Sequence, residues 1–265
     1  MYNVREWNRF LIPYEQAVEE LKIKFKSLRN GYREVGEYSP IEFVTGRVKE
    51  VSSILEKSKK LDIAYDDIQA KMEDIAGIRI MCQLIDDIYD VVDFINDRDG
   101  KDFTVLYAKD YIKNPKESGY RSFHLVIKYP VYTAFGFTEI LAEIQIRTLA
   151  MNFWAIIEHS LNYKYRKQIP GKIAERLTRA AESVWALDAE MLAIKEEITS
   201  AQVLFEVNSD AVQSITTQIQ LMNAGGEKDL AAMYQKKLDN TLDLSSSDAL
   251  EALLMEMNSH LEEIS

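Results

Sequence analysis

The spacing of apolar residues alternates between a helical and a strand period over the first part of the chain. Residues 7–32 place apolar side chains at intervals of three and four, which predicts an amphipathic helix that ends at Gly31. Residues 41–47, "IEFVTGR", alternate as in a strand, and residues 51–60 return to the helical period. The chain is therefore expected to begin with a helix, a strand and a second helix.

The next stretch is predicted to supply the remaining strands. "GIRIMCQL" (77–84) has the pattern of a strand, and "DDIYDVVDFINDRDG" (86–100) has that of a helix stopped by Gly100. Three further strands are predicted within residues 102–112, 122–129 and 137–148.

The rest of the sequence has helical spacing. From Leu149 to about Phe205 apolar residues recur at three and four, with a break at Pro170 and Gly171, and residues 206–265 are expected to form two or three short amphipathic helices. We predict an α+β fold, with a mixed β-sheet of about five strands flanked by helices and with helical N- and C-terminal extensions. The predicted boundary separates a domain of residues 1–205 from an acidic helical extension, residues 206–265, to which the sequence assigns no role.

Charge limits the class of protein. The net charge of −11 argues against a general binder of duplex nucleic acid or of membranes, because such binding relies on clustered cations. Residues 201–265 carry 11 acidic residues and 3 lysines, which leaves 32 acidic and 29 basic residues in the first 200 positions. An anionic substrate is therefore compatible with the first part of the chain.

The sequence gives no sign of a membrane segment or a disulfide. No stretch approaches the roughly 18 consecutive apolar residues of a membrane helix, and the N-terminus lacks the apolar core of a signal peptide. The single cysteine, Cys82, is expected to be a small buried hydrophobic residue. We expect a cytoplasmic protein that does not bind membranes.

The strands are expected to have one apolar and one polar face. Residues 137–148 place Glu143, Gln145 and Arg147 opposite an apolar face, which consists of Ile140, Ala142, Ile144 and Ile146. If this strand lies beside residues 77–84 and 122–129, their polar faces combine into a floor that bears Arg79, His124, Glu143 and Gln145. A solvated sheet face without a ligand is the alternative that this pattern leaves open.

The residue types near this floor suit a nucleotide polyphosphate bound with a divalent cation. Carboxylates such as Asp74 and Glu143 hold Mg²⁺, arginines neutralise phosphates in fork geometry, and aromatic rings stack on bases. The available cations include Arg47, Arg79, Lys116 and Arg121. The sequence contains no G-x-x-x-x-G-K-[ST], G-x-G-x-x-G or G-x-S-x-G motif, and three histidines are too few for a multi-histidine metal centre.

Four segments resemble the motifs of the RelA/SpoT-type alarmone synthetases, in family order and spacing. They are "SPIEFVTGRVKEVSSILEK" (39–57), "MEDIAGIRIMCQ" (72–83), "KESGYRSFHLV" (116–126) and "EIQIRTLAMNFWAIIEHSLNYKY" (143–165). The resemblance covers roughly residues 5–200 and is nearest to the small, single-domain, RelQ-like members. It implies a nucleotidyltransferase-like synthetase domain that transfers the pyrophosphoryl group of ATP to the 3′-hydroxyl of GDP or GTP and releases AMP. Bifunctional members of this family carry a hydrolase domain with a His-Asp metal motif. No histidine of this sequence is followed directly by an aspartate, so hydrolase activity is not expected.

The resemblance also implies roles for individual residues. Asp74 and Glu143 match the catalytic acids that hold Mg²⁺, and Glu143 would take the proton of the 3′-hydroxyl. The positions that match ATP-binding residues are Arg47, Lys49 and Arg79. The positions that match GDP- or GTP-binding residues are Lys109, Lys116, Tyr120, His124, Gln145 and Asn152.

Within the acceptor set, Tyr120 would stack on the guanine through its ring, so the loss of its hydroxyl in Tyr120→Phe is expected to be nearly harmless. Lys116 and His124 would bind the acceptor's phosphates, and Asn152 would read the guanine edge. Lys109 stands where arginine is common in this subgroup and is expected only to contact a phosphate.

A second site is suggested by the first helix. Lys22, Lys26 and Arg29 lie on one helical face, which by spacing alone reads as a solvated basic face. The resemblance implies instead a homotetramer in which pppGpp binds as an allosteric activator, with Phe43 and Thr45 completing the site.

Two alternatives stay open at this point. One is a regulator that keeps the synthetase fold but binds single-stranded RNA in its basic clefts. The other is a pyrophosphokinase that acts on a different acceptor. The acids Asp74 and Glu143 favour an enzyme, and Tyr120 with Asn152 favours guanine.

Overall fold

One mixed five-stranded sheet organises the first part of the chain in this computed structural model. The strand order is β1-β2-β5-β4-β3, in which β2 and β5 are parallel and the other neighbouring pairs are antiparallel. The strands are β1 (Phe43–Val48), β2 (Ala76–Cys82), β3 (Thr104–Asp110), β4 (Phe123–Thr133) and β5 (Gly136–Thr148). The predicted α+β class with a mixed sheet of five strands is confirmed.

Helices flank this sheet and, with the connecting turns and loops, form the rest of the described chain, which comprises residues 4–164, 170–243 and 247–264. In order they are α1 (Val4–Glu34), α2 (Val51–Lys60), α3 (Ile68–Lys71), α4 (Ile85–Asn96), α5 (Leu149–Lys164), α6 (Gly171–Ala224), α7 (Lys228–Asp243) and α8 (Ser247–Ile264), with a 3₁₀ turn at Tyr65–Asp67. No helix in the described ranges is both long and apolar enough to cross a membrane.

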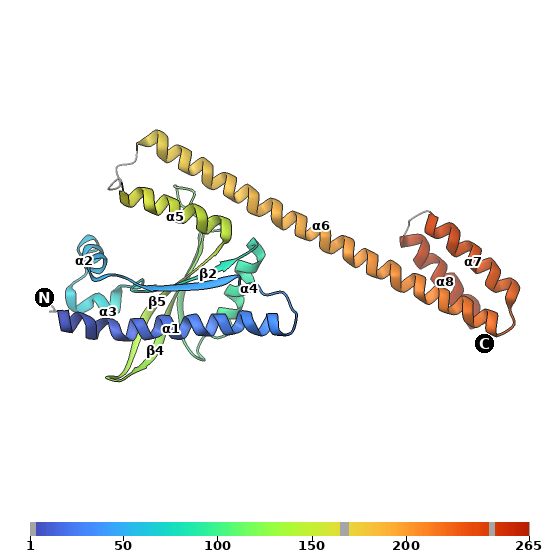
Figure 1. Cartoon of the computed structure of the whole chain (residues 1–265), viewed down its shortest axis with the longest axis horizontal. Helices are drawn as coiled ribbons and strands as arrows, with labels where there is room; N and C mark the ends of the chain where they lie inside the picture. Colours follow the sequence, from blue (N-terminus) through green and yellow to red (C-terminus); the bar gives the residue numbers. More distant parts are fainter. Residues whose placement is uncertain (1–3, 165–169, 244–246, 265) are drawn as a thin grey trace. The chain divides into compact units, whose positions relative to one another are not determined.

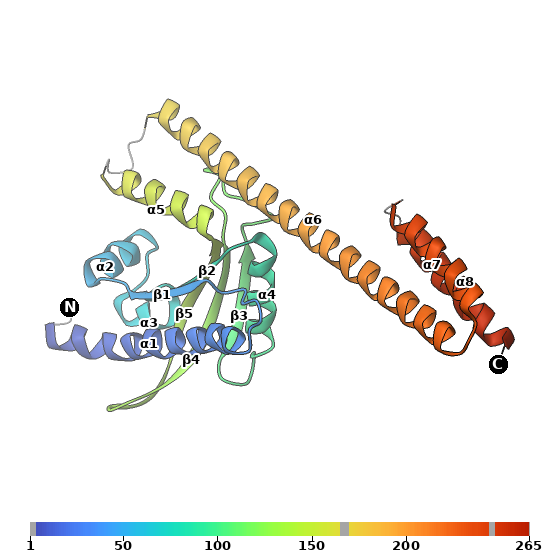
Figure 2. The same ribbon diagram turned by 45° about the vertical axis from the view of Figure 1, so that its right-hand side comes forward.

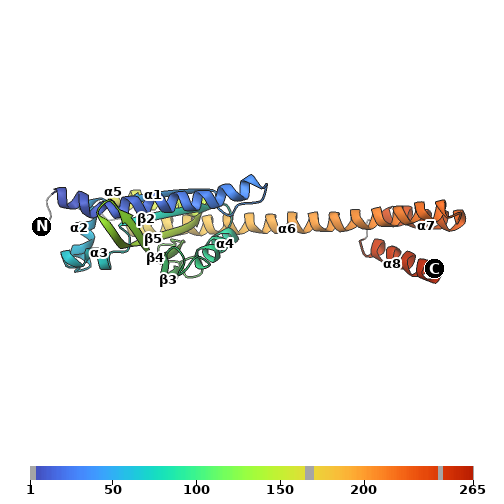
Figure 3. The same ribbon diagram turned by 90° about the horizontal axis from the view of Figure 1, so that it is seen from below.

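Helices cover both faces of the sheet. α1 runs across β1, β2, β4 and β5 on one face, while α5 lies on the other (Figures 1, 2 and 3). The alternation predicted from the sequence is present, since Ile78, Ile80, Ile144 and Ile146 are fully buried in the main core. The polar face of the same strands is thereby left toward α5.

The first helix is longer than predicted. α1 continues through Gly31 to Glu34, and the chain turns at Gly36, whose φ is +75°. A glycine inside a helix costs only about 1 kcal/mol relative to alanine, which is too little to end a helix that is packed along a sheet. The expected stop at Gly31 was therefore wrong.

The chain divides into two compact units, Met1–Leu192 and Ala193–Ser265. The division between these units and the boundary predicted near residue 205 both fall inside the continuous helix α6. In the second unit, α7 and α8 form a helical hairpin, and the core there consists of apolar side chains from the end of α6, from α7 and from α8, such as Ile219, Tyr234 and Met257 (Figure 1). The predicted break at residues 224–226 is the turn between α6 and α7, where Gly226 has a φ of +93°.

Candidate active site

A row of polar side chains crosses all five strands. Lys109 of β3 pairs with His124 of β4, and His124 pairs with Gln145 of β5. Gln145 in turn pairs with Arg79 of β2, which pairs with Thr45 of β1. Paired residues on neighbouring strands point to the same face, so the polar floor predicted from the sequence is present.

Glu143 lies in the next row of the same face. It pairs with Gly77 of β2, and Gly77 pairs with Arg47 of β1. A cavity of about 540 Å³ opens between these rows and α5. Its lining residues are Arg47, Arg79, Lys116, Ser118, Tyr120, His124, Glu143, Gln145, Arg147, Ala155, Ile156, Glu158 and His159.

Two neighbours hold the Glu143 carboxylate. Nδ1 of His124 lies 2.9 Å from Oε1, and Nε2 of Gln145 donates a hydrogen bond of 2.7 Å to Oε2. Burial alone would raise the pKa of Glu143, but the hydrogen bonds from His124 and Gln145 outweigh it, and the pKa lies below its ordinary value. Glu143 is therefore ionised at neutral pH, so it can bind a cation or accept a proton.

His124 makes hydrogen bonds at both ring nitrogens. Its Nε2 lies 2.8 Å from the hydroxyl oxygen of Tyr120, which also accepts a hydrogen bond of 2.9 Å from Arg147. His124, which is predicted to bind acceptor phosphates, lines the cavity, and its ring connects Tyr120 to Glu143.

Arginines concentrate positive charge around the cavity. Burial lowers the pKa of the Arg79 guanidinium, and repulsion from Arg147 and Arg47 lowers it further. Gathering like charges in this way is unfavourable without a ligand, so the arrangement suits a polyanion. Arg47 and Arg79, the positions that match ATP-binding residues, both line this cavity.

Asp74 lies in the turn before β2. Nζ of Lys49 donates a hydrogen bond of 2.7 Å to Oδ2, and Nζ of Lys57 on α2 lies 2.8 Å from Oδ1. Burial raises the pKa of Asp74, but the contacts with Lys49 and Lys57 outweigh this effect, and the pKa lies below its ordinary value. Lys49 was expected to contact ATP, and here it holds Asp74.

The loop at residues 116–121 brings Lys116 and Tyr120 to the cavity. Gly119 in this loop has a φ of +83°, and a Cβ atom there would lie 2.6 Å from Cβ of Ala181 on α6. Only glycine suits both this backbone conformation and this close approach. Nζ of Lys116 lies 4.8 Å from the centroid of the Tyr120 ring.

Comparison with known proteins agrees with this geometry. A family profile described as "Region found in RelA / SpoT proteins" matches residues 46–168. GTP pyrophosphokinase YjbM of Bacillus subtilis (strain 168) is 56% identical over 201 residues, which are 76% of this chain and 94% of that protein. The chain belongs to the RelA/SpoT family. The resemblance predicted from the four motifs is confirmed.

Solved structures of RelA/SpoT relatives have the same fold. The crystal structure of small alarmone synthetase 1 from Bacillus subtilis bound to its product pppGpp has a TM-score of 0.70 and 56% identity, and it covers 73% of this chain and 98% of that chain. The structure of the same synthetase bound to AMPCPP has a TM-score of 0.66 and 54% identity, with 74% and 99% covered.

The RelA/SpoT match contains the whole cavity, since every lining residue falls within positions 46–168. Two predicted acceptor contacts do not line it. Lys109 is exposed at the end of the polar row, with Nζ 4.8 Å from the Tyr107 ring centroid. Asn152 lies in the first turn of α5, and its Oδ1 is buried without a hydrogen-bond donor in the described part of the chain.

The residues of the expected second site are divided between two elements. Lys22, Lys26 and Arg29 are on α1, where Lys26 is exposed and Arg29 donates to the carbonyl oxygen of Glu42. Phe43 and Thr45 are exposed on β1, on the sheet face opposite to α1. All of them precede the region that the family profile matches.

Sequence reasoning missed several residues of the site. Arg147 is only 4% exposed and lines the cavity, and its position on the polar face with Glu143 and Gln145 was a usable signal. Lys57 offered no such signal, because its contact with Asp74 depends on how α2 packs. Glu158 and His159 of α5 line the cavity as well, and they lie outside the strand pattern.

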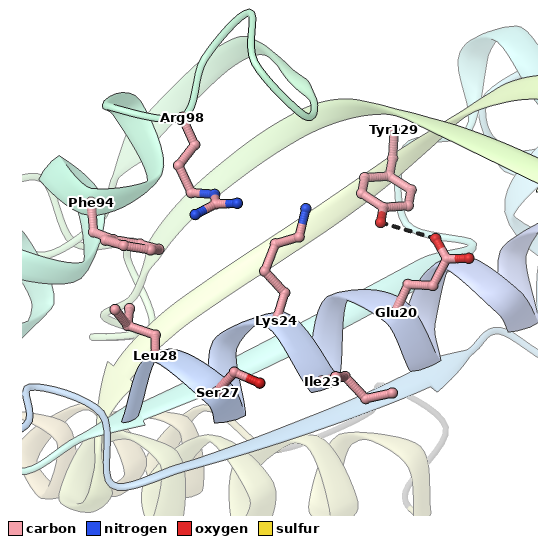
Figure 4. A pocket seen from close by; sticks show the side chains of 8 residues that line it. All are labelled: Glu20, Ile23, Lys24, Ser27, Leu28, Phe94, Arg98 and Tyr129. Atoms are coloured by element: carbon pink, nitrogen blue, oxygen red, sulfur yellow. Dashed lines mark hydrogen bonds between the residues drawn. The ribbon is translucent and has the colours of Figure 1, made fainter. Parts of the chain in front are cut away.

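A second cavity, of about 560 Å³, lies against α1 on the other face of the sheet (Figure 4). Its charged groups and its tyrosine hydroxyl already have partners within the protein. Lys24 and Arg98 both form ion pairs with Asp102, and the Tyr129 hydroxyl donates a hydrogen bond of 2.9 Å to Glu20. This cavity therefore has fewer polar groups available to bind a charged ligand than the cavity beside Glu143.

Proposed function

We propose that this protein is a (p)ppGpp synthetase, which transfers the pyrophosphoryl group of ATP to the 3′-hydroxyl of GDP or GTP. The observation that carries the proposal is an ionised carboxylate, Glu143, fixed on the floor of a cavity lined by arginines. The comparisons support it, because a relative is named GTP pyrophosphokinase and a solved structure of a small alarmone synthetase is described with pppGpp as its product.

The site supplies what this reaction requires. The 3′-oxygen of the acceptor attacks the β-phosphorus of ATP, the bond from that phosphorus to the α,β-bridging oxygen breaks, and this oxygen leaves with AMP. Glu143 takes the proton of the 3′-hydroxyl, while Arg47 and Arg79 neutralise the phosphates of ATP. Catalysis by these residues is mainly positioning and electrostatic stabilisation.

Asp74 and Glu143 suit Mg²⁺. Both are ionised, and they are close enough for the charge of Asp74 to affect the pKa of Glu143. An ion held by these two carboxylates would take its remaining ligands from substrate phosphates and water. When bound, Mg²⁺ would neutralise charge on the transferred group.

The acceptor is bound through the loop at residues 116–121. The Tyr120 ring stacks on guanine, and Lys116 approaches the acceptor's phosphates from the same loop. Gly119 fixes this loop against α6, so the position of the acceptor depends on that helix.

The same proposal includes a homotetramer with pppGpp as an activator. Leu187, Met191 and Ile194 of α6 are 53%, 44% and 39% exposed at intervals of four and three, which is the spacing of a helix–helix contact. Lys26 of α1 and Phe43 and Thr45 of β1 are exposed and suit a shared polyanion site between subunits. Glutamate at Leu187 and Met191 should lower the mass measured by light scattering, whereas an unchanged mass would contradict this contact.

Incubation with α-³²P-labelled ATP and Mg²⁺, with GDP or GTP as acceptor, tests the activity. We expect labelled AMP in equal amount to a 3′-pyrophosphorylated guanine nucleotide. Glu143→Gln should form neither product. Its control is Glu139→Gln on the same strand, β5, since Glu139 forms an ion pair with Lys128 and does not line the cavity. AMP formed only with a different acceptor would indicate another pyrophosphokinase. Tight binding of single-stranded RNA without AMP formation would favour the RNA-binding alternative.

A further inference from the structure

The hydroxyl of Tyr120 connects the acceptor loop to Glu143. Its oxygen lies 2.8 Å from Nε2 of His124, whose Nδ1 lies 2.9 Å from Oε1 of Glu143. The resemblance gave Tyr120 a role only through its ring. The structure adds a path of two hydrogen bonds from this tyrosine to the residue that takes the substrate's proton.

The donors along this path run in one direction. A guanidinium can only donate, so the Tyr120 oxygen accepts the hydrogen bond of 2.9 Å from Arg147. The ionised carboxylate of Glu143 can only accept, so Nδ1 of His124 donates to it, and Nε2 of the neutral ring then accepts from the Tyr120 hydroxyl. The contacts therefore run from Arg147 through Tyr120 and His124 to Glu143.

Gln145 closes this path into a ring. Its Oε1 accepts a hydrogen bond from Arg147, and its Nε2 donates one of 2.7 Å to Oε2 of Glu143. Both oxygens of Glu143 are thus fixed by groups that Arg147 orients. A carboxylate held in this way directs its remaining lone pairs toward a defined point, which a general base requires.

Burial makes this ring sensitive to the loss of one member. His124 is 8% exposed and Arg147 is 4% exposed, so water cannot easily replace a missing partner. Loss of the Tyr120 hydroxyl would leave both of these groups with an unsatisfied contact, and they would shift to find others. Because His124 and Gln145 both hold Glu143, that shift would reach the carboxylate.

We propose that the Tyr120 hydroxyl, His124 and Arg147 are positioning groups for Glu143, so that the tyrosine that stacks on the acceptor also sets the orientation of the base. This inference rests on the proposed function. It gives Tyr120 two separable roles, in which the ring binds the acceptor and the hydroxyl orients the base. It also reverses the expectation that Tyr120→Phe is nearly harmless.

Tyr120→Phe isolates the role of the hydroxyl. We expect kcat for pyrophosphoryl transfer to fall about tenfold while KM for GTP changes by less than about twofold, because the ring is retained. The matched control is Tyr129→Phe. Tyr129 is on the same strand as His124 but on the opposite face, where its hydroxyl also donates to a carboxylate, that of Glu20 (Figure 4). This control should keep the wild-type kcat.

A double-mutant cycle tests whether the ring acts as one unit. Nη2 of Arg147 donates both of these hydrogen bonds, and Arg147→Lys keeps the charge but has a shorter side chain that ends before the position of Nη2. Each single substitution should lower kcat, and the double variant should fall by clearly less than the product of the two losses. Fully multiplicative losses would overturn a shared positioning role.

The remaining outcomes separate this inference from the proposed function. If the wild-type protein transfers pyrophosphate and Tyr120→Phe keeps its kcat, only the positioning role fails. The same role fails if Tyr129→Phe lowers kcat as much, since a general loss of stability would then explain both. If the wild-type protein forms neither AMP nor a 3′-pyrophosphorylated nucleotide, both proposals fail.

Discussion

Oγ1 of Thr148 donates a hydrogen bond of 2.7 Å to Oδ2 of Asp188, which joins the end of β5 to helix α6. The same oxygen accepts from the backbone N–H of Met151, so Thr148 also caps the start of α5. Asp188 is only 5% exposed, and burial raises its pKa to about 6 despite the hydrogen bond from Thr148. The burial of Asp188 should therefore make the free energy of unfolding depend on pH.

The folded-state pKa of Asp188 lies above its unfolded value, so the folded protein binds more protons between about pH 4 and pH 6. The free energy of unfolding from this group is then greatest below pH 4 and is lost as pH rises through about 6. Asp188→Asn removes this dependence. The difference in free energy of unfolding between the variant and the wild type should shift in favour of the variant by on the order of 1 kcal/mol from pH 5 to pH 8. Thermal unfolding of both proteins at pH 5 and pH 8 measures this shift. Parallel pH profiles of the two proteins would contradict the assignment.

Glu143→Gln should abolish pyrophosphoryl transfer while the protein stays folded. The amide can accept from His124 but cannot take a proton or hold a cation, so a loss of about 100-fold or more in kcat is expected. Retention of more than about a tenth of the activity would exclude Glu143 as the base. A melting temperature close to that of the wild type shows that the loss is chemical.

Tyr120→Ala should separate acceptor binding from ATP binding. Stacking on a base contributes about 1–3 kcal/mol, so KM for GTP should rise about tenfold or more while KM for ATP changes little. Equal changes in both constants would show that Tyr120 maintains the shape of the cavity and does not bind guanine.

Gly119→Ala should damage the acceptor loop through contact with α6. The new methyl group would lie 2.6 Å from Cβ of Ala181, in addition to the cost of a φ of +83°. Gly100→Ala is the matched control, because Gly100 has a φ of +70° and nothing within 4 Å of an added Cβ. Both variants should lose about 1 kcal/mol of stability from the backbone, but only Gly119→Ala should also raise KM for GTP. Equal effects of the two variants on KM would argue against the role of this contact.

Lys26→Ala should remove activation by pppGpp without changing the basal rate. Lys26 is on α1, on the opposite side of the sheet from the cavity, so its charge has no direct part in the reaction. Coupling between two sites is typically 1–3 kcal/mol, so micromolar pppGpp should accelerate the wild type about 5- to 150-fold. Lys59→Ala, at an exposed lysine of α2, is the control and should respond as the wild type does. A lower basal rate in Lys26→Ala would place this helix at the active site.

The sheet could be predicted well because the alternation of apolar and polar residues in each strand is a local pattern of the sequence. The period of two placed Arg79, His124, Glu143 and Gln145 on one face before their neighbours were known, and the register aligns three of them in one row. The error at Gly31 came from the opposite situation, in which packing along the sheet overrode a local helix breaker.

The contacts within the site could be predicted less well. Residue types indicated a polyanion site with two acids, but the hydrogen bonds of His124 to Glu143 and Tyr120 depend on distances between strands that a sequence does not contain. The lysine pair at Asp74 likewise joins residues from a loop and from α2. The residue pattern of the sequence therefore indicated which side chains lie on the same surface. Which of these side chains contact one another depends on how the strands and helices pack.

The polar row described above also has a consequence for how the protein folds. Its members come from all five strands, and Thr45 and Gln145 are a hundred positions apart in sequence although Arg79 joins them in space. Contacts of such high sequence separation form late, because the intervening chain must first be ordered. A partly folded molecule would lack the complete row, so nucleotide binding in the cavity would report complete assembly of the sheet, and nucleotides would stabilise only the fully folded state.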